Sequence, residues 1–173
     1  MKNIKSIKEL RNDLSCVEKK PGCYIWWFDK NGKDMLLKSL PDFNISSIPR
    51  KGNYYALYYG IAKDCRQRIN WHINQKHSFS AVKSGYLSTL RQTLSALLGK
   101  DMTCSEKDVN DFMDTHCCWS WEYTPSRETA EDIESVELST QSKNCYPLNI
   151  QKNKTVSHDV IQKLTELRKK HKK

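Results

Sequence analysis

Residues 58–72 carry three side chains that can bind or act on a phosphate group. A tyrosine-rich, strand-like run leads into a basic segment that contains Arg68 and His72. If residues 65–74 form a helix, Arg68 and His72 lie four residues apart and project from one face. Tyr58 would lie at the end of the preceding strand. A hydroxyl, a guanidinium and an imidazole could thus reach one phosphate, although an amphipathic surface helix with ordinary basic residues explains this segment equally well.

The elements that must position these side chains are predicted from hydrophobic patterns. Aromatic, β-prone or alternating runs predict strands at residues 23–28, 54–60 and 117–123. Apolar residues at three- and four-residue spacing predict helices at residues 4–19, 65–74, 87–98, around 109–113, 127–143 and 158–169. A turn is expected at residues 29–32 and a decorated connection at residues 35–53. The side chains described above therefore span a strand-to-helix connection.

The composition is that of a basic globular domain. The 173 residues are 38% hydrophobic and 28% charged, and the net charge is +9. Such a charge favours a polyanionic partner, because Lys and Arg release counterions when they neutralise phosphates. Residues 162–173 hold six basic residues against one glutamate and so supply +5 of this charge. A basic tail alone could therefore account for much of the signal.

Seven cysteines, an odd number without a Cys-x-x-Cys spacing, indicate reduced thiols in a cytosolic protein. A zinc site that uses His116, Cys117 or Cys118 is less favoured, because neighbouring strand residues point to opposite faces. The N-terminus lacks the apolar run of a signal peptide, and no segment approaches the ~20 apolar residues of a membrane span. We therefore expect a cytoplasmic protein.

Two tripeptides and the residues behind them resemble a family signature. Residues 22–24 are Gly-Cys-Tyr and residues 58–60 are Tyr-Tyr-Gly. They resemble the two motifs that name the GIY-YIG nuclease family. Arg68 lies ten residues after Tyr58 and His72 four further on, which is similar to the spacing of the family's catalytic arginine and of a frequently used His or Tyr.

The resemblance implies how four side chains would take part in phosphodiester hydrolysis. Arg68 would bind the phosphate through its forked donors, and His72 would hydrogen-bond that phosphate or orient the attacking water. Tyr58 resembles the family tyrosine proposed as general base, a role that requires a nearby cation to lower a phenol pKa ordinarily near about 10. Tyr24 would orient the water or the phosphate from the adjacent strand.

The resemblance also implies a metal-binding glutamate on a helix ahead of an asparagine. Glu137 lies twelve residues before Asn149 and is the preferred ligand for Mg2+, with Mn2+ as an alternative cation. Glu134 is the alternative ligand, because it has the apolar Leu138 four residues later, as in the family, whereas polar residues follow Glu137. Asn149 is expected to hold the end of the glutamate helix against the site.

Neighbouring residues offer alternative registers for the two central residues. Tyr59 is the alternative to Tyr58, but it takes the apolar middle position of the motif and should point to the opposite face of the strand. Arg66 is the alternative to Arg68 and lies on another side of the helix. We therefore prefer Tyr58 and Arg68.

The chain departs from the family pattern at two places. Ile61 follows the second-motif glycine, where many members have Lys or Ser, so the role of a lysine there would fall to Lys63 or to metal-bound water. The 33 residues between Tyr24 and Tyr58 form a longer connection than the short hairpin of the smallest members. This insertion could carry DNA recognition or dimerisation, or could be a surface elaboration.

The resemblance covers residues 21–150 and implies a single α/β (α+β) domain over residues 1–173. Its core would be a small, mainly antiparallel three-stranded sheet flanked by helices. An N-terminal helix and a basic C-terminal helix and tail would be appended to this core.

The implied activity is that of a metal-dependent DNA endonuclease of the restriction or defence type. Residues 88–94, which contain Leu-Arg, and the Pro-Leu-Asn at residues 147–149 resemble the restriction-endonuclease-like subgroup. A repair or mobile-element nuclease is the nearest alternative, and a catalytically inactive DNA-binding module is the alternative of another class. A homodimer is a reasonable arrangement for cutting a palindrome.

Overall fold

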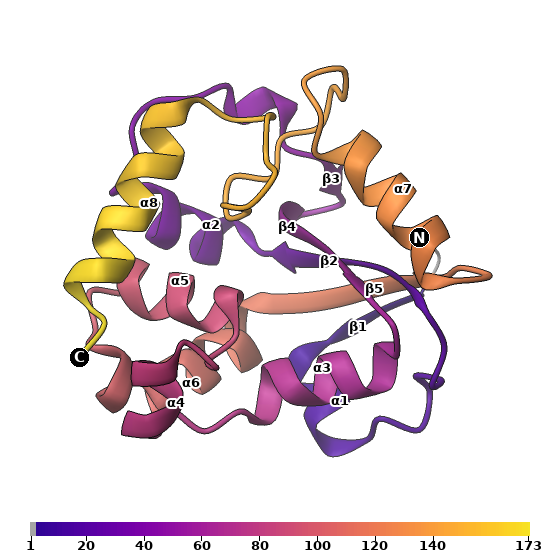
Figure 1. Ribbon diagram of the computed structural model, residues 1–173, viewed down its shortest axis with the longest axis horizontal. Helices are drawn as coiled ribbons and strands as arrows, with labels where there is room; N and C mark the ends of the chain where they lie inside the picture. Colours follow the sequence, from indigo (N-terminus) through magenta and orange to yellow (C-terminus); the bar gives the residue numbers. More distant parts are fainter. Residues whose placement is uncertain (1–2) are drawn as a thin grey trace.

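The computed structural model describes residues 3–173, which form helices around one antiparallel sheet (Figure 1). The five strands lie in the order β1-β5-β2-β4-β3. They are β1 (Asn3–Ser6), β2 (Gly22–Phe28), β3 (Arg50–Lys51), β4 (Tyr54–Ala62) and β5 (Cys117–Tyr123). The helices are α1 (Ile7–Asn12), α2 (Lys30–Leu37), α3 (Cys65–Asn74), α4 (Phe79–Ser84), α5 (Thr89–Leu97), α6 (Glu106–His116), α7 (Arg127–Glu137) and α8 (His158–Lys170). None of the helices within residues 3–173 is long and apolar enough to cross a membrane.

The three predicted strands are the central strands β5, β2 and β4, but the prediction of a three-stranded sheet is wrong because two short strands lie at its edges. β1 occupies the start of the predicted helix 4–19. The Ser6 hydroxyl accepts the backbone N–H of Glu9 at 3.2 Å, and the Glu9 carboxylate accepts the Ser6 N–H at 2.9 Å. This capping box ends the strand and starts α1 at Ile7. At the other edge, β3 pairs with only two residues of β4.

The 33-residue insertion is partly core. The predicted turn at residues 29–32 is instead the first turn of α2, because the Asp29 carboxylate accepts the Gly32 N–H at 2.7 Å and caps a helix there. Leu36 on α2 and Ile48 in the following loop are buried in the main core. The insertion therefore supports the sheet and is not only a surface elaboration.

The predicted helix 127–143 is also shorter than expected. α7 ends at Glu137, and an irregular loop connects it to α8. This loop lies against β4 near the end of α7, where its backbone forms hydrogen bonds to Leu57 and Leu138. The loop thereby joins β4 to the end of α7.

Alternating side chains of β2 divide the core between the two faces of the sheet. The larger cluster contains residues of α3, α5, α6 and α8, and the smaller one contains residues of α7. From β2, the larger cluster receives Tyr24, Trp26 and Phe28, and the smaller one receives Cys23, Ile25 and Trp27. Tyr24 therefore faces α3, as the period of a strand requires.

Candidate active site

The two motif tyrosines lie together on the face of the sheet that α3 covers. β2 and β4 pair with Tyr24 opposite Gly60 and Trp26 opposite Tyr58. The rings of Tyr24 and Tyr58 are stacked with centroids 6.5 Å apart. A Cβ atom on Gly60 would lie 2.6 Å from the Tyr24 ring. The glycine of the second motif is therefore the residue that lets the tyrosine of the first motif lie across β4.

α3 begins at a cap that fixes its position behind β4. The Asp64 carboxylate accepts the Gln67 N–H at 2.8 Å, and the Cys65 N–H donates to the Lys20 carbonyl at 2.9 Å. The helix spans the residues predicted for it and carries Arg68 and His72. The predicted strand-to-helix connection is thus confirmed.

Arg68 is free to bind a ligand, whereas the alternative arginine is not. The Arg68 guanidinium lies 5.1 Å from the Trp71 ring centroid, and within residues 3–173 it forms no direct hydrogen bond or ion pair. Arg66 donates to the carbonyls of Val17 and Ser15 and fastens the segment before β2 to α3. The geometry thus favours Arg68 for phosphate binding.

His72 occupies a different place from the one expected for a phosphate ligand. It is only 2% exposed, and its Nε2 atom lies 3.1 Å from the Tyr24 hydroxyl while its Nδ1 atom lies 3.2 Å from the Ser88 hydroxyl. Burial, followed by the charges of Arg68 and Arg91, lowers the pKa of His72 to about 3. A neutral, fully bonded ring holds Tyr24 in place and does not present itself to a phosphate.

The structure brings Glu134, and not Glu137, to the tyrosine side of the site. The Glu137 carboxylate accepts the Tyr146 hydroxyl at 2.9 Å and the Asn144 amide at 2.8 Å. Tyr146 packs on Tyr59 in the smaller core cluster, on the face opposite Tyr24 and Tyr58. Counting twelve residues back from the asparagine selected Glu137, but the distance along an irregular loop does not fix a position on the helix before it.

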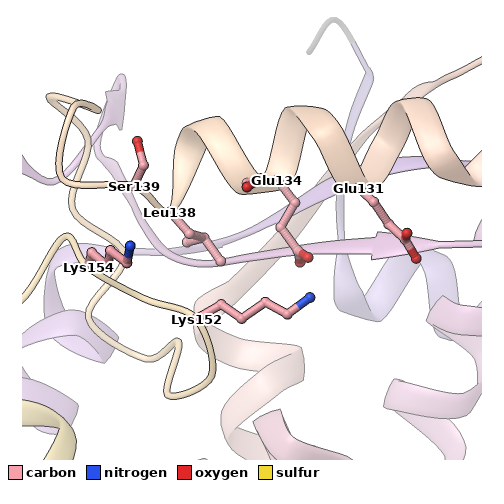
Figure 2. Close-up of a pocket in the computed structure, with 7 residues that line it drawn as sticks. Glu131, Glu134, Leu138, Ser139, Lys152 and Lys154 are labelled. Atoms are coloured by element: carbon pink, nitrogen blue, oxygen red, sulfur yellow. The ribbon is translucent and has the colours of Figure 1, made fainter.

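Glu134 lies between two adjoining cavities. One, of about 310 Å³, is lined by Glu131, Glu134, Ser135, Leu138, Ser139, Lys152 and Lys154. The other, of about 130 Å³, is lined by Tyr58, Thr89, Glu134, Leu138, Asn149, Ile150, Gln151 and Lys152. Figure 2 shows the Glu134 carboxylate and the Lys152 ammonium directed toward each other across the larger cavity.

The electrostatics of this region tie Tyr58 to charged groups from three helices. Burial and, to a smaller extent, the negative charge of Glu134 raise the pKa of Tyr58 to about 12. The charges of Arg68 and Arg168 and a hydrogen bond with Tyr24 act in the opposite direction. Burial also raises the pKa of Glu134. Burial and the charge of Glu134 are the two causes that raise the pKa of Tyr58. A cation that neutralises Glu134 would remove the second of them and so lower this pKa.

Asn149 was expected to hold the end of the glutamate helix, but it fastens the loop after α7 to β4 instead. Its side-chain oxygen accepts the Tyr59 N–H at 2.8 Å, and its amide donates to the Tyr59 carbonyl at 2.7 Å. The end of α7 is held instead by Lys154, whose N–H donates to the Leu138 carbonyl at 2.8 Å. The loop is therefore bonded to β4 next to Tyr58 and to the end of α7, four residues after Glu134.

The sequence-based prediction of the site missed two basic residues near it. Lys152 lies in the loop with φ 58°, an uncommon conformation for a residue with a side chain, and no sequence pattern marks it. Arg168 on α8 donates to Gln92 on α5, while its Nε atom is buried without a partner among the described residues. Arg168 lies four residues after Leu164, so the four-residue spacing of the buried side of α8 could have identified it.

The donor set at Glu134 fits a hard divalent cation. Mg2+ commonly takes one or two carboxylates and keeps several waters, and Glu134 shares its cavity with Glu131. Within residues 3–173 no group of three or more His, Cys, Asp or Glu residues could hold a metal by itself. Cys117 and Cys118 belong to opposite core clusters, as expected for neighbours on a strand. A cation at Glu134 would therefore complete its coordination with water and substrate oxygens.

Comparison with known proteins agrees with the motifs. The family model of the GIY-YIG catalytic domain matches residues 22–170, a range that includes every candidate site residue and all of α8. Neither the curated proteins nor the solved structures include a significant match. The family match covers most of the sequence and confirms the resemblance seen in the two tripeptides. The chain belongs to the GIY-YIG family of nuclease domains.

Proposed function

We propose that the protein is a metal-dependent DNA endonuclease that hydrolyses a phosphodiester bond. The observation that carries this proposal is the convergence of Tyr58, Arg68 and Glu134. Tyr58 and the half-buried Glu134 line one cavity, and the positive charge of Arg68 acts on both of them. A binding module needs the positive charge but has no use for a buried tyrosine next to a carboxylate. Phosphodiester hydrolysis uses all three groups.

Each residue has a role that follows from its surroundings. Arg68 binds the phosphate with its free guanidinium and stabilises the extra negative charge of the transition state. Tyr58 must first give up its own proton, which is favoured when the charge of Glu134 is neutralised; the phenolate then accepts a hydrogen bond from the attacking water and takes its proton. Tyr24, held by His72, orients the same water. As the water oxygen bonds to phosphorus, the ester P–O bond breaks, and the leaving oxygen receives a proton from a solvent water molecule while Tyr58 keeps the proton of the attacking water.

Glu134 is the proposed ligand for Mg2+ or Mn2+. A divalent cation supplies charge stabilisation at the leaving oxygen when it is bound. Lys152 faces Glu134 across the cavity, and its positive charge favours the ionised carboxylate. Glu137 is proposed to be structural, because both its partners belong to the loop after α7.

Restriction or host defence is the proposed biological role, on the strength of the Leu-Arg segment at residues 88–94 and the Pro-Leu-Asn at residues 147–149. A homodimer would let two copies of the site cut both strands of a palindrome. Discrete fragments from phage or plasmid DNA would support this role, whereas cleavage confined to branches or lesions would support a repair nuclease.

The test of the activity incubates supercoiled and linear DNA with the protein and Mg2+ or Mn2+. Arg68→Ala should lose cleavage by roughly two to three orders of magnitude, as when a transition-state donor is removed. Arg50→Ala is the matched control, because Arg50 packs over Tyr55 near β3, in a different part of the surface. Absence of cleavage by the wild type with either metal, or full activity in Arg68→Ala, would rule the proposal out.

A further inference from the structure

A third cavity lies beside Arg68. It has a volume of about 280 Å³ and is lined by Lys63, Asp64, Gln67, Arg68, Trp71 and Tyr86. We call it the aromatic cavity. Of its lining residues only Arg68 belongs to the proposed catalytic group, and the cavity shares no residue with the two cavities at Glu134.

One wall of the aromatic cavity is an exposed ring on a fixed backbone. Tyr86 is 67% exposed, yet its carbonyl accepts the Gln75 side-chain amide at 2.8 Å. The N–H of the next residue, Leu87, donates to the Ala81 carbonyl at 3.2 Å. The Tyr86 ring meets the Trp71 ring edge to face, with centroids 6.0 Å apart. An aromatic ring held in this way can stack with a flat partner without the cost of ordering its backbone.

The charges around this wall suit a nucleotide. Arg68 lies over the Trp71 ring, and the exposed Lys63 also lines the cavity. These two positive charges attract the phosphates of a nucleic-acid backbone to the cavity. Asp64 and Gln67 add hydrogen-bonding groups of the kind that contact base edges. Aromatic faces beside positive charges are the combination that binds unpaired bases in single-stranded nucleic acids.

We propose that the aromatic cavity binds the base of a nucleotide next to the phosphate held by Arg68, and that this base is unpaired and unstacked. The inference rests on the proposed nuclease function and adds a substrate class to it. A base inside an intact duplex is covered on both faces by its neighbours and cannot stack on Tyr86, so a duplex must first give up that base. DNA that is single-stranded, frayed or distorted at the cleavage point is therefore bound without this cost, whereas a duplex restriction site must be unstacked there before it is cut.

The test measures DNA binding without metal, so that it does not depend on cleavage. Fluorescence anisotropy in EDTA compares a labelled single-stranded oligonucleotide with a blunt duplex of the same length. The wild type should bind the single strand more tightly. Tyr86→Ala should weaken single-strand binding roughly 5- to 150-fold, the effect of losing one base–aromatic stack, while Tyr86→Phe should retain it.

Phe79→Ala is the matched control, because Phe79 is 69% exposed on α4 but does not line the aromatic cavity. The proposal is overturned if Tyr86→Ala and Phe79→Ala bind the single strand alike, or if Tyr86→Ala weakens the duplex as much as the single strand. Arg68-dependent cleavage with no Tyr86 effect would reject the base site alone. A Tyr86 effect without cleavage under any condition would reject the nuclease activity and leave the base site standing.

Discussion

Replacing Asn149 by alanine should destabilise the protein by roughly 2–4 kcal/mol. The side chain is 6% exposed and forms hydrogen bonds of 2.7 and 2.8 Å with the carbonyl and the N–H of Tyr59. Tyr59 directs these groups away from β2, so no neighbouring strand can take over. Alanine leaves both groups without a partner, and each buried unsatisfied group costs about 1–3 kcal/mol. Two such groups would cost about 2–6 kcal/mol together. We expect a loss in the lower part of this total, because water can reach the sheet edge once the amide is gone.

The measurement is urea unfolding of Asn149→Ala, analysed for the free energy of unfolding and its dependence on urea. Asn144→Ala is the control, because it also removes one side-chain amide from the same loop, but that amide bonds to the half-buried Glu137 and not to the backbone of β4. The control should lose less than about 1 kcal/mol. The reasoning is refuted if Asn149→Ala loses no more stability than Asn144→Ala.

Three further predictions concern the supports of the site. Arg91→Met should destabilise the protein by roughly 3–5 kcal/mol in urea unfolding, because the buried guanidinium donates to His77, Asn110 and the His72 carbonyl at 2.7–2.8 Å; a loss below 1 kcal/mol would contradict this. His72 has a folded pKa of about 3 against 6.5 when unfolded, so the unfolded state binds more protons between these values and stability falls as pH falls from 6.5 to about 3. His72→Gln should show a smaller fall over the same range, and an equal fall would speak against a neutral, buried imidazole. Gly60→Ala should lower the free energy of unfolding by about 1–3 kcal/mol through overpacking and should abolish cleavage, because the new methyl group meets the Tyr24 ring. A stable, active variant would show that Tyr24 does not lie as described.

The part of the site that could be predicted depends on short-range periodicity. Alternation along β2 and β4 places Tyr24 and Tyr58 on one face, and the helical period of α3 places His72 next to them. These relations involve neighbouring residues within one element, and the two tripeptides supply the pairing between the strands. The bonded, buried state of His72 could not be predicted in this way, because it depends on Ser88 at the start of α5.

The parts that could not be predicted depend on loops and on very short elements. β1 has four residues and β3 has two, which is too few for a periodic pattern to stand out. The choice between Glu134 and Glu137 depends on how the loop after α7 folds back on β4. That path is determined by the hydrogen bonds of Asn149, Asn153 and Lys154, which join residues far apart in the sequence or within an irregular loop.

The measurement that tests the central claim most directly compares metal-dependent DNA cleavage by Glu134→Gln and Glu137→Gln. Both variants remove one negative charge from α7 and keep the shape of the side chain. We predict that Glu134→Gln loses cleavage but still binds DNA without metal, whereas Glu137→Gln still cleaves and loses only stability from its contacts with Asn144 and Tyr146. Loss of cleavage in a folded Glu137→Gln, with full activity in Glu134→Gln, would contradict the account of the site.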